Sequence, residues 1–500
     1  MTARRLFISF FLMYGILIPV LAQEFVAENT SASIAMIGSC IIIALLFWSK
    51  HVVFINIIIS FYVFQNYLTR PFVSIFEKEL SAKHLAYIES NNSYFNPGAA
   101  AVVYWSLFSL LLAWLIGILL SKSSRKDNLF SLPKIFTRLD QVILKGGPPF
   151  FLAFGLLFVL NYQSPETGLR AGITGEGEGS FLWGMASLGT INIVCLYVFL
   201  KRQHAGQRPA RYYLLVPPLI LALSGVLSGS RSAVYILIIM SLVYWLALNI
   251  HKRWKLHRLL KTFSLAMIVV PIAGISALFA QVLRPLFRYT ESVDATDILE
   301  SLNYESVLLN KENLLFGITE LLHRLSALKA QFYILNDWYI HNPLLYYNPL
   351  TSLMRIINGL IPGDIFSGIL TINQLFDYIY YDTVLVYNSE MWGIQGTLYL
   401  YFGHILAPIV VFFIAIVTNR LYPLFEKNLM ASPAFAAFFT LLLFDIITNG
   451  TAERVILVDI VLPMTSFVIF LVLYKAFSLF LPIRNRLPKK SGRISVNIVH

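Results

Sequence analysis

Apolar runs follow one another along the whole chain and are separated by short polar segments. Most of these runs are long enough, as helices, to cross the roughly 30 Å of hydrocarbon in a bilayer. Flanking charges and turn residues give their ends. Twelve runs predict twelve transmembrane helices, of which the fifth is the shortest: Leu6–Ala22, Ile34–Trp48, Val52–Tyr67, Ala99–Leu120, Pro148–Leu160, Phe181–Leu200, Tyr212–Ser228, Ala233–Ile250, Phe263–Leu283, Thr397–Val417, Ala434–Ile447 and Val455–Phe477.

Composition agrees with this pattern. The chain has 500 residues, of which 57% are hydrophobic and 13% charged, whereas soluble domains carry about 25% charged residues. Both cysteines, Cys40 and Cys195, fall within apolar runs, so packing explains them better than a disulfide framework or a metal site. The first run ends in a sequence that resembles a signal-peptidase site, but we predict a retained span, since many further spans follow.

The distribution of charge predicts the orientation of these helices. With the N-terminus inside, the inner segments hold 26 of the 38 Lys and Arg residues and three acidic residues, and the outer segments hold 12 basic and 21 acidic residues. Short inner loops rich in Lys and Arg are typical of the cytoplasmic side. We therefore expect a multi-pass protein with both termini in the cytoplasm. The net charge of +12 reports this topology, and nucleic-acid binding is not needed to explain it.

One long polar stretch, Arg284–Gly396, interrupts the apolar pattern and falls on the outer side. Its first half predicts helices over Asp294–Asn310 and Ile318–Ile340. The organisation expected is nine spans in residues 1–283, this large loop in 284–396, three spans in 397–480 and a basic tail in 481–500.

The inner segments contain no nucleotide-binding signature. One of them, Ile135–Ile143, is apolar with Lys134, Arg138 and Lys145 interspersed, a pattern expected of a helix along the inner membrane surface.

Arginines on the outer side are candidates for binding a phosphate group. Arg231 lies in the tight turn Ser228–Ser232, where small residues allow a ligand close to the backbone, and its guanidinium suits a pyrophosphate. The alternative is a side chain that reaches lipid headgroups. Arg284 and Arg288 stand four positions apart at the start of the loop, and Arg324 follows on an amphipathic helix. Interfacial anchoring and a solvated helix face are the alternatives for these three.

Several side chains could remove a proton from a sugar hydroxyl. Glu390 and His404 are nearest the tenth predicted span, and His341 lies in the loop. Spacing alone does not choose among these and four other carboxylates, Glu291, Asp294, Asp297 and Asp382. The loop is also dense in aromatic residues, among them Trp338, Tyr339 and Trp392, which suit sugar rings but are also ordinary membrane-belt residues.

Together these features resemble a known family, the Wzy-type polysaccharide (O-antigen or capsule) repeat-unit polymerases and the related O-antigen ligases. The resemblance rests on about twelve spans, a large outer loop in the second half, and three local motifs. One motif departs from the family pattern, because Tyr-Phe-Gly stands where Asn-Phe-Gly is usual. The motifs are Ser228-Gly229-Ser230-Arg231, Glu390-Met391-Trp392-Gly393-x-x-Gly396 and Tyr401-Phe402-Gly403.

The resemblance implies a GT-C-like, all-helical glycosyltransferase in the bacterial inner membrane. It would join oligosaccharide repeat units carried on undecaprenyl pyrophosphate, with arginines stabilising the departing charge and a carboxylate or His deprotonating the acceptor. No metal and no cofactor are expected, and the expected partners are the lipid-linked oligosaccharide, membrane lipids and a chain-length regulator. Two alternatives stay open: an O-antigen ligase with a lipid A-core acceptor, and a flippase or other transporter. The transporter is disfavoured by spans nearly free of charged residues.

Overall fold

The computed structural model describes about half of the chain. The described residues are 3–21, 29–49, 52–68, 97–121, 132–162, 188–207, 212–227, 231–250, 393–448 and 460–481, with single positions at 315, 319, 335, 353, 354 and 357. In this part of the chain the elements are all helical, and no strand occurs. The prediction of an all-helical protein is therefore confirmed for the described residues.

Helices coincide with eleven of the twelve predicted spans, and Phe263–Leu283 lies outside the described residues. By length and hydropathy four of them are able to cross a membrane, namely Thr30–Trp48, Ala100–Leu120, Tyr401–Ala431 and Leu462–Phe480, and several shorter apolar helices accompany them. Twelve spans and a GT-C-like architecture remain predictions. The helices are α1 (Ala3–Leu21), α3 (Thr30–Trp48), α4 (Val53–Val63), the π-helix η1 (Phe64–Leu68), α7 (Pro97–Leu120), α8 (Lys134–Lys145), α9 (Pro148–Tyr162), α12 (Leu188–His204), η3 (Tyr212–Leu215), α13 (Val216–Leu227), α14 (Arg231–Asn249), α21 (Gly393–Ala431), α22 (Pro433–Thr448) and α24 (Leu462–Phe480).

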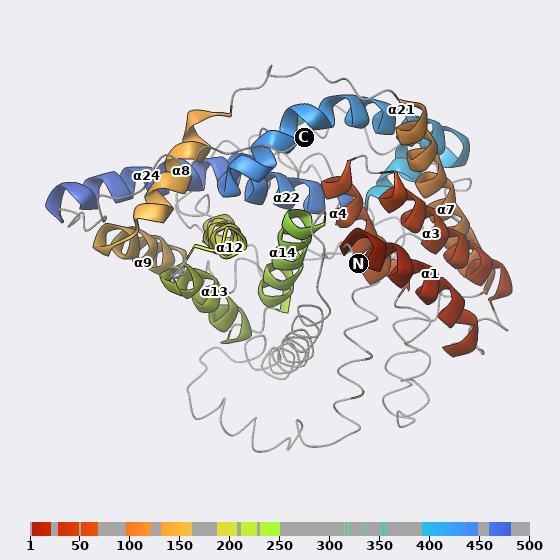
Figure 1. Cartoon of the computed structure of the whole chain (residues 1–500), viewed down its shortest axis with the longest axis horizontal. Helices are drawn as coiled ribbons and strands as arrows, with labels where there is room; N and C mark the ends of the chain where they lie inside the picture. The colour runs from red at the N-terminus through yellow and green to blue at the C-terminus, as the bar shows by residue number, and fades with distance from the viewer. Residues whose placement is uncertain are drawn as a thin grey trace.

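The helices form two groups joined through the middle of the molecule. Helices α1, α3, α4, α7 and α21 pack together on one side, and α8, α9, α12, α13 and α24 on the other (Figure 1). Helix α22 contacts α4 and α21 in the first group and α12 in the second, and α14 contacts both α4 and α12. Segments far apart in sequence are thereby brought into one bundle.

Helices α7 and α21 pack closely against each other. Gly117 of α7 has no side chain, and a Cβ built there would lie 2.6 Å from the carbonyl oxygen of Phe412 and 2.7 Å from the Cβ of Ala415. Small residues allow two helix backbones to approach in this way, which is the usual means of helix association in a membrane.

Contacts between helices join ends that the predicted topology places on the same side. At the end where α1 begins, here called the basic end, Arg4 donates to the carbonyl oxygens of Phe47 and Trp48 at the end of α3. Further contacts at this end are those of the Phe54 N–H with the Tyr422 hydroxyl (3.2 Å), the Asn419 amide with the Ser121 carbonyl (3.2 Å), and Lys201 with the Ala431 carbonyl. The alternating direction of successive spans predicts that these helix ends lie on the same side of the membrane. Only the charge count predicts that this side is the cytoplasmic one.

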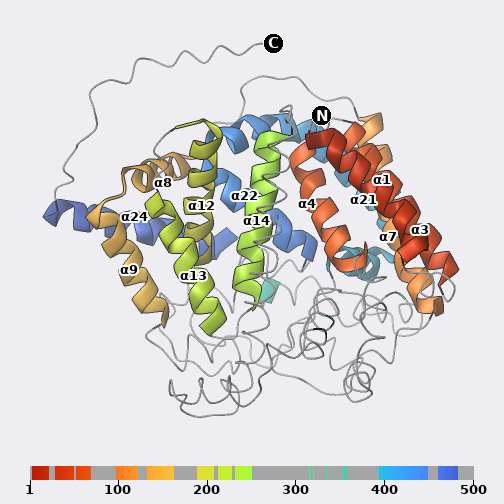
Figure 2. The ribbon, with the colours of Figure 1, turned by 60° about the horizontal axis from the view of Figure 1, so that its bottom comes forward.

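At the opposite end of the bundle, here called the network end, α1 and α4 end and α7 and α21 begin. Tyr14 of α1 donates to the carbonyl oxygen of Leu68 at the end of η1. The indole N–H of Trp105 in α7 donates to Ser31 Oγ at the start of α3, over 2.9 Å. Figure 2 shows α4, α9, α13 and α14 running side by side between the two ends.

Large apolar side chains cover much of the outer surface of the bundle. Ile405 is 78% exposed and Ile16 is 70% exposed, and α7 and α24 present further such residues. An exposed apolar surface of this extent is costly in water and favourable against lipid tails. The described helices are therefore those of a membrane-embedded protein.

The largest difference from the predicted helix bounds, among the described ends, is at α21. The helix extends from Gly393 to Ala431, well past the predicted Thr397–Val417 at each end. Hydropathy marks only the part of a helix that suits lipid, and helical hydrogen bonding continues into polar sequence at both ends. Helix α21 is also interrupted at Gly403, whose φ of 67° and ψ of −176° are not helical. Only glycine adopts this backbone readily.

Candidate functional site

The structure describes only part of the predicted site. Eight predicted site residues lie outside the described residues and are neither placed nor brought together: Glu390, His341, Arg284, Arg288, Arg324, Trp338, Tyr339 and Trp392. His404 lies in α21, directly after the interruption at Gly403. Arg231 is the first residue of α14, and its backbone position is described.

The first turns of α21 face a set of buried polar groups at the network end. Gln395 and Tyr399 are four positions apart and so share one face of the helix. Their side chains are 1% and 2% exposed. The face that they share lies against α7 and η1, and it explains why an amide and a phenol occur at the start of an otherwise apolar helix.

The side chain of Gln395 is fully hydrogen-bonded. Its Nε2 donates to the carbonyl oxygen of Val103 (3.0 Å) and to Ser106 Oγ (2.7 Å), both in α7. Its Oε1 accepts from the hydroxyl of Tyr67 in η1. An amide has two N–H donors and one carbonyl, so each has a partner here. A fully satisfied buried network of this kind holds its members in one arrangement.

Two tyrosines extend the network on either side of Gln395. The Tyr399 hydroxyl donates to the Ser106 carbonyl (2.9 Å) and lies 2.8 Å from Ser109 Oγ. The Tyr104 hydroxyl donates to the carbonyl oxygen of Tyr67 (2.9 Å). We call these five residues with Gln395 the Gln395 network: Tyr67, Tyr104, Ser106, Ser109 and Tyr399.

The carbonyl of Tyr67 lies in the last turn of the π-helix η1, and the last carbonyls of a helix have no partner within that helix. In a π-helix the hydrogen bonds run to the fifth residue, and the change of register shifts carbonyls and side chains relative to an α-helix. Tyr67 is completely buried there and meets the ring of Tyr104 edge-on at 6.1 Å. Such turns are found often at functional sites.

His404 connects this region to the polar stretch 284–396. Its Nε2 lies 3.1 Å from the carbonyl oxygen of Leu335, which is 2% exposed. A carbonyl oxygen only accepts, so Nε2 is the donor in this contact. The ring of His404 also packs on Tyr399, with 5.2 Å between ring centres. A predicted site residue is thus held between the Gln395 network and the polar stretch.

The six isolated described positions in the polar stretch are all helical, but only two of them fall in a predicted helix. Thr319 and Leu335 are both helical and buried, and Thr319 Oγ1 donates to the Leu315 carbonyl four positions earlier, over 2.8 Å. Both fall in the predicted helix Ile318–Ile340. The other predicted helix, Asp294–Asn310, lies outside the described residues.

Arg231 occupies the N-terminus of α14, after a break of three positions that follows Leu227 of α13. The first backbone N–H groups of a helix have no partner within it and favour an anion. This position is compatible with the predicted clamp.

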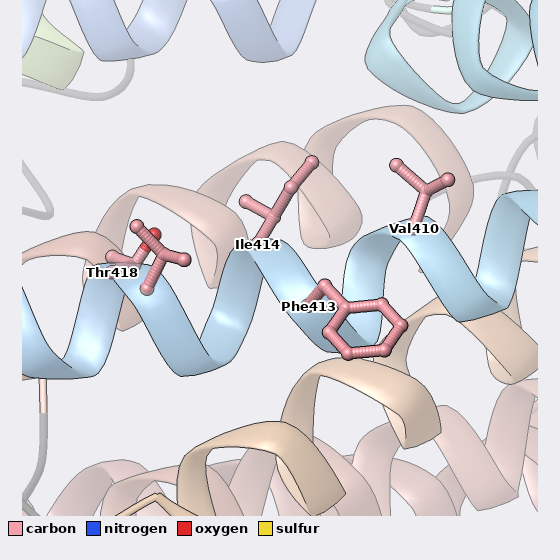
Figure 3. A pocket seen from close by; sticks show the side chains of 5 residues that line it. Val410, Phe413, Ile414 and Thr418 are labelled. Atoms are coloured by element: carbon pink, nitrogen blue, oxygen red, sulfur yellow. The ribbon is translucent and has the colours of Figure 1, made fainter.

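Beyond His404, α21 has an apolar surface hollow of about 330 Å³. Figure 3 shows Val410, Ile414 and Thr418 projecting from one side of the helix, with Phe413 nearby, and Val417 completes the lining. The lining is nearly all hydrocarbon, which suits a lipid chain and offers no group for acid–base chemistry.

The sequence analysis missed the Gln395 network because its members are uncharged. The spans are nearly free of charge, yet α4, α7 and α21 contain neutral polar residues that meet in the interior. A signal was present in Ser106 and Ser109, three positions apart in an apolar run, and in Gln395, two positions before the tenth run. Polar residues at helical spacing within a span indicate a face that meets another helix.

Comparison with known proteins adds no assignment. The chain matches no protein-family model, no curated protein and no solved structure. Among the described residues, no group of three or more His, Cys, Asp or Glu side chains could hold a metal ion.

Proposed function

We propose that this chain is an integral-membrane glycosyltransferase that polymerises lipid-linked oligosaccharide repeat units on the outer face of the bacterial inner membrane. The observation that carries the proposal is the contact of His404 with Leu335. It joins the polar stretch to the network end, where the buried Gln395 network surrounds the start of α21. The motif resemblance in Glu390–Gly396 and Tyr401–Gly403 falls on the same segment of chain.

The chemistry fits the residues available on that side. Outside the cytoplasm the donor sugar must arrive already activated, and a lipid pyrophosphate is such a donor. Arg231, at a helix N-terminus, is suited to stabilise the departing pyrophosphate, together with Arg284, Arg288 and Arg324. His404 is one candidate to accept the proton of the acceptor hydroxyl, and Glu390 and His341 are the other candidates. Trp338, Tyr339 and Trp392 would contact the sugar rings.

The apolar hollow on α21 supports a lipid-linked substrate. It begins six positions after His404, which is about 9 Å along a helix. A substrate with its reacting group near His404 would have its hydrocarbon chain within reach of this surface.

The first test is a strain that lacks this chain, examined by the gel profile of its surface polysaccharide. A polymerase is expected to leave single repeat units on the surface, and complementation with the intact chain should restore the long polymer. Long polymer retained on its lipid carrier would instead indicate a ligase. A normal surface profile would contradict both activities, and loss of all repeat units from the outer face would favour a flippase.

A further inference from the structure

Helix α8 (Lys134–Lys145) contains charged residues that the proposed function does not use. It lies across the basic end of the bundle (Figure 2), and its chain turns by 112° before α9 begins. Gly146 and Gly147 make this turn, with φ of 58° and 85°. Where α9 stands along the membrane normal, α8 lies within about 22° of the membrane plane.

The apolar face of α8 is covered by protein. Phe136 meets the rings of Phe435, Phe438 and Phe467 at 5.3, 5.6 and 6.0 Å, which belong to α22 and α24. The expected position of α8 along the inner membrane surface stays a prediction, but protein rather than lipid covers this face. Aromatic packing against α22 and α24 removes it from lipid, so any contact between α8 and the membrane is made by its other face.

The acidic residue of α8 is covered as well. Asp140 is 8% exposed and accepts hydrogen bonds from Ser432 Oγ (2.5 Å) and from the N–H of Ala434 (2.9 Å). The bond from the Ala434 N–H caps the start of α22, together with Ser432 Oγ, which accepts from the Phe435 N–H. The only carboxylate of the helix is thus withdrawn from its surface.

Five residues of α8 are exposed, namely Thr137 and four residues that we call the basic stripe: Lys134, Arg138, Gln141 and Lys145. Steps of four, three and four residues place them along a single helix face. Eleven residues of helix span about 16 Å, so three positive charges and no negative charge are arranged in a row. The rule that Lys and Arg are enriched on the inner side explains why these residues are cations. It does not explain why they lie on a different face of α8 from Asp140.

We propose that the basic stripe of α8 binds the headgroups of anionic phospholipids in the inner leaflet. Three features favour this partner. The stripe is uniformly positive, it is orientated near the membrane plane, and it borders helices whose exposed residues are apolar, as at the 40% exposed Phe151 of α9. A basic segment beside a membrane is attracted to an anionic surface, and the attraction weakens within a Debye length.

The test uses the full chain, purified in detergent, with the midpoint of thermal unfolding followed as lipid is added to the micelles. Phosphatidylglycerol is expected to raise the midpoint at low concentration, and phosphatidylcholine is not. In the variant K134Q/R138Q/K145Q the same rise should need about 100-fold more phosphatidylglycerol, because each cation near an anionic surface contributes about fivefold. High salt should abolish the response of the original chain.

Two matched variants control for charge and for folding. R420Q/K427Q/K475Q removes three exposed cations from α21 and α24 and should respond as the original chain does. K134R/R138K/K145R keeps the charge of the stripe and should also respond. Equal responses from the α8 variant and the original chain would overturn the proposal, as would an equal loss in the α21/α24 variant. The thermal midpoint does not depend on glycosyl transfer. A negative result in this experiment would therefore leave the proposed function untouched.

Discussion

The hydroxyl of Tyr67 donates a hydrogen bond to the side-chain carbonyl of Gln395, although 328 positions separate the two residues in the chain. Both side chains are buried, and Gln395 also binds two groups of α7. This pair therefore ties three helices at the network end and fixes the start of α21.

Loss of the Gln395 amide should destabilise the bundle. Q395L keeps most of the side-chain volume but leaves the Tyr67 and Ser106 hydroxyls without this partner, at a cost on the order of 3 kcal/mol. The thermal midpoint of the purified protein should fall accordingly. L406A, at a position 54% exposed on the same helix, serves as control and should change little. In the double variant Y67F/Q395L, a cost equal to the sum of the single costs would contradict a shared bond.

His404 can be tested for a chemical role apart from its structural one. H404A removes both the donor to the Leu335 carbonyl and the ring lone pair. H404Q restores an N–H donor of similar reach and has no titratable nitrogen. If His404 accepts the proton, both variants should lose long polymer although the protein is present at its normal level. Polymer retained in H404Q and lost in H404A would show that only the hydrogen bond to Leu335 matters.

The contact of α7 with α21 gives a comparison between two helical glycines. In G117A the new methyl group would press on the backbone of Phe412, and forced overpacking costs about 1–3 kcal/mol. In G155A the new methyl meets nothing within 4 Å, and exchange of a helical Gly for Ala is expected to be neutral or stabilising by up to about 1 kcal/mol. Thermal midpoints measured side by side should therefore move in different directions. A similar midpoint for both variants would contradict the close approach.

Asp140 should make stability depend on pH. Burial raises the pKa of this carboxyl to about 6, although the hydrogen bonds from Ser432 and Ala434 favour its charged form. Its pKa is thus higher in the folded chain than in the unfolded one. The contribution to stability is fully present below about pH 4 and is lost as the pH rises through about 6, by up to about 3 kcal/mol.

The variant D140N isolates this effect. Its amide keeps an acceptor for the Ala434 N–H and has no charge to bury. We expect D140N to unfold at a higher temperature than the original chain at pH 8 and to lose that advantage toward pH 4. D140A, which also lacks the cap of α22, should be less stable than D140N at every pH by about 1 kcal/mol. A constant difference between D140N and the original chain across pH 4–8 would refute the assignment.

Orientation can be tested with single cysteines and a reagent that does not cross membranes. Both native cysteines are buried, with no exposed surface, and should give little background. S326C, in the polar stretch, should react in intact spheroplasts. T137C, exposed on α8, should react only after the inner face is opened. The reverse pattern would invert the topology.

Apolar length was sufficient to predict where the described helices lie, because a lipid-facing helix must be apolar over nearly its whole length. It could not predict their ends. The last eleven residues of α21 include Leu421, Lys427 and Asn428, which suit a helix outside lipid as well as they suit a loop. Nor could it predict the interruption at Gly403, because a glycine within an apolar run is compatible with an unbroken helix.

The site was less accessible to sequence reasoning than the fold. Charge at the membrane boundary drew attention to arginines and carboxylates, whereas the described interior is joined by neutral groups such as Gln395, Tyr104 and Ser106. Their importance depends on which helix faces which. That arrangement joins α7 to α21 across nearly 300 positions. The periodicity of either segment taken alone cannot predict such a contact.

The same separation has a consequence for biosynthesis. Ser106 is translated 289 positions before Gln395, an interval of roughly 15–60 s at about 5–20 residues per second. During that time α7 resides in the bilayer without the amide that completes its polar face. Its serine hydroxyls have acceptors within the helix, since Ser106 donates to the Val103 carbonyl and Ser109 to the Ser106 carbonyl, both over 2.8 Å. The N-terminal helices can therefore await α21 as an inserted, incomplete half, and a ribosome that stops before Gln395 leaves that half without its closing helix.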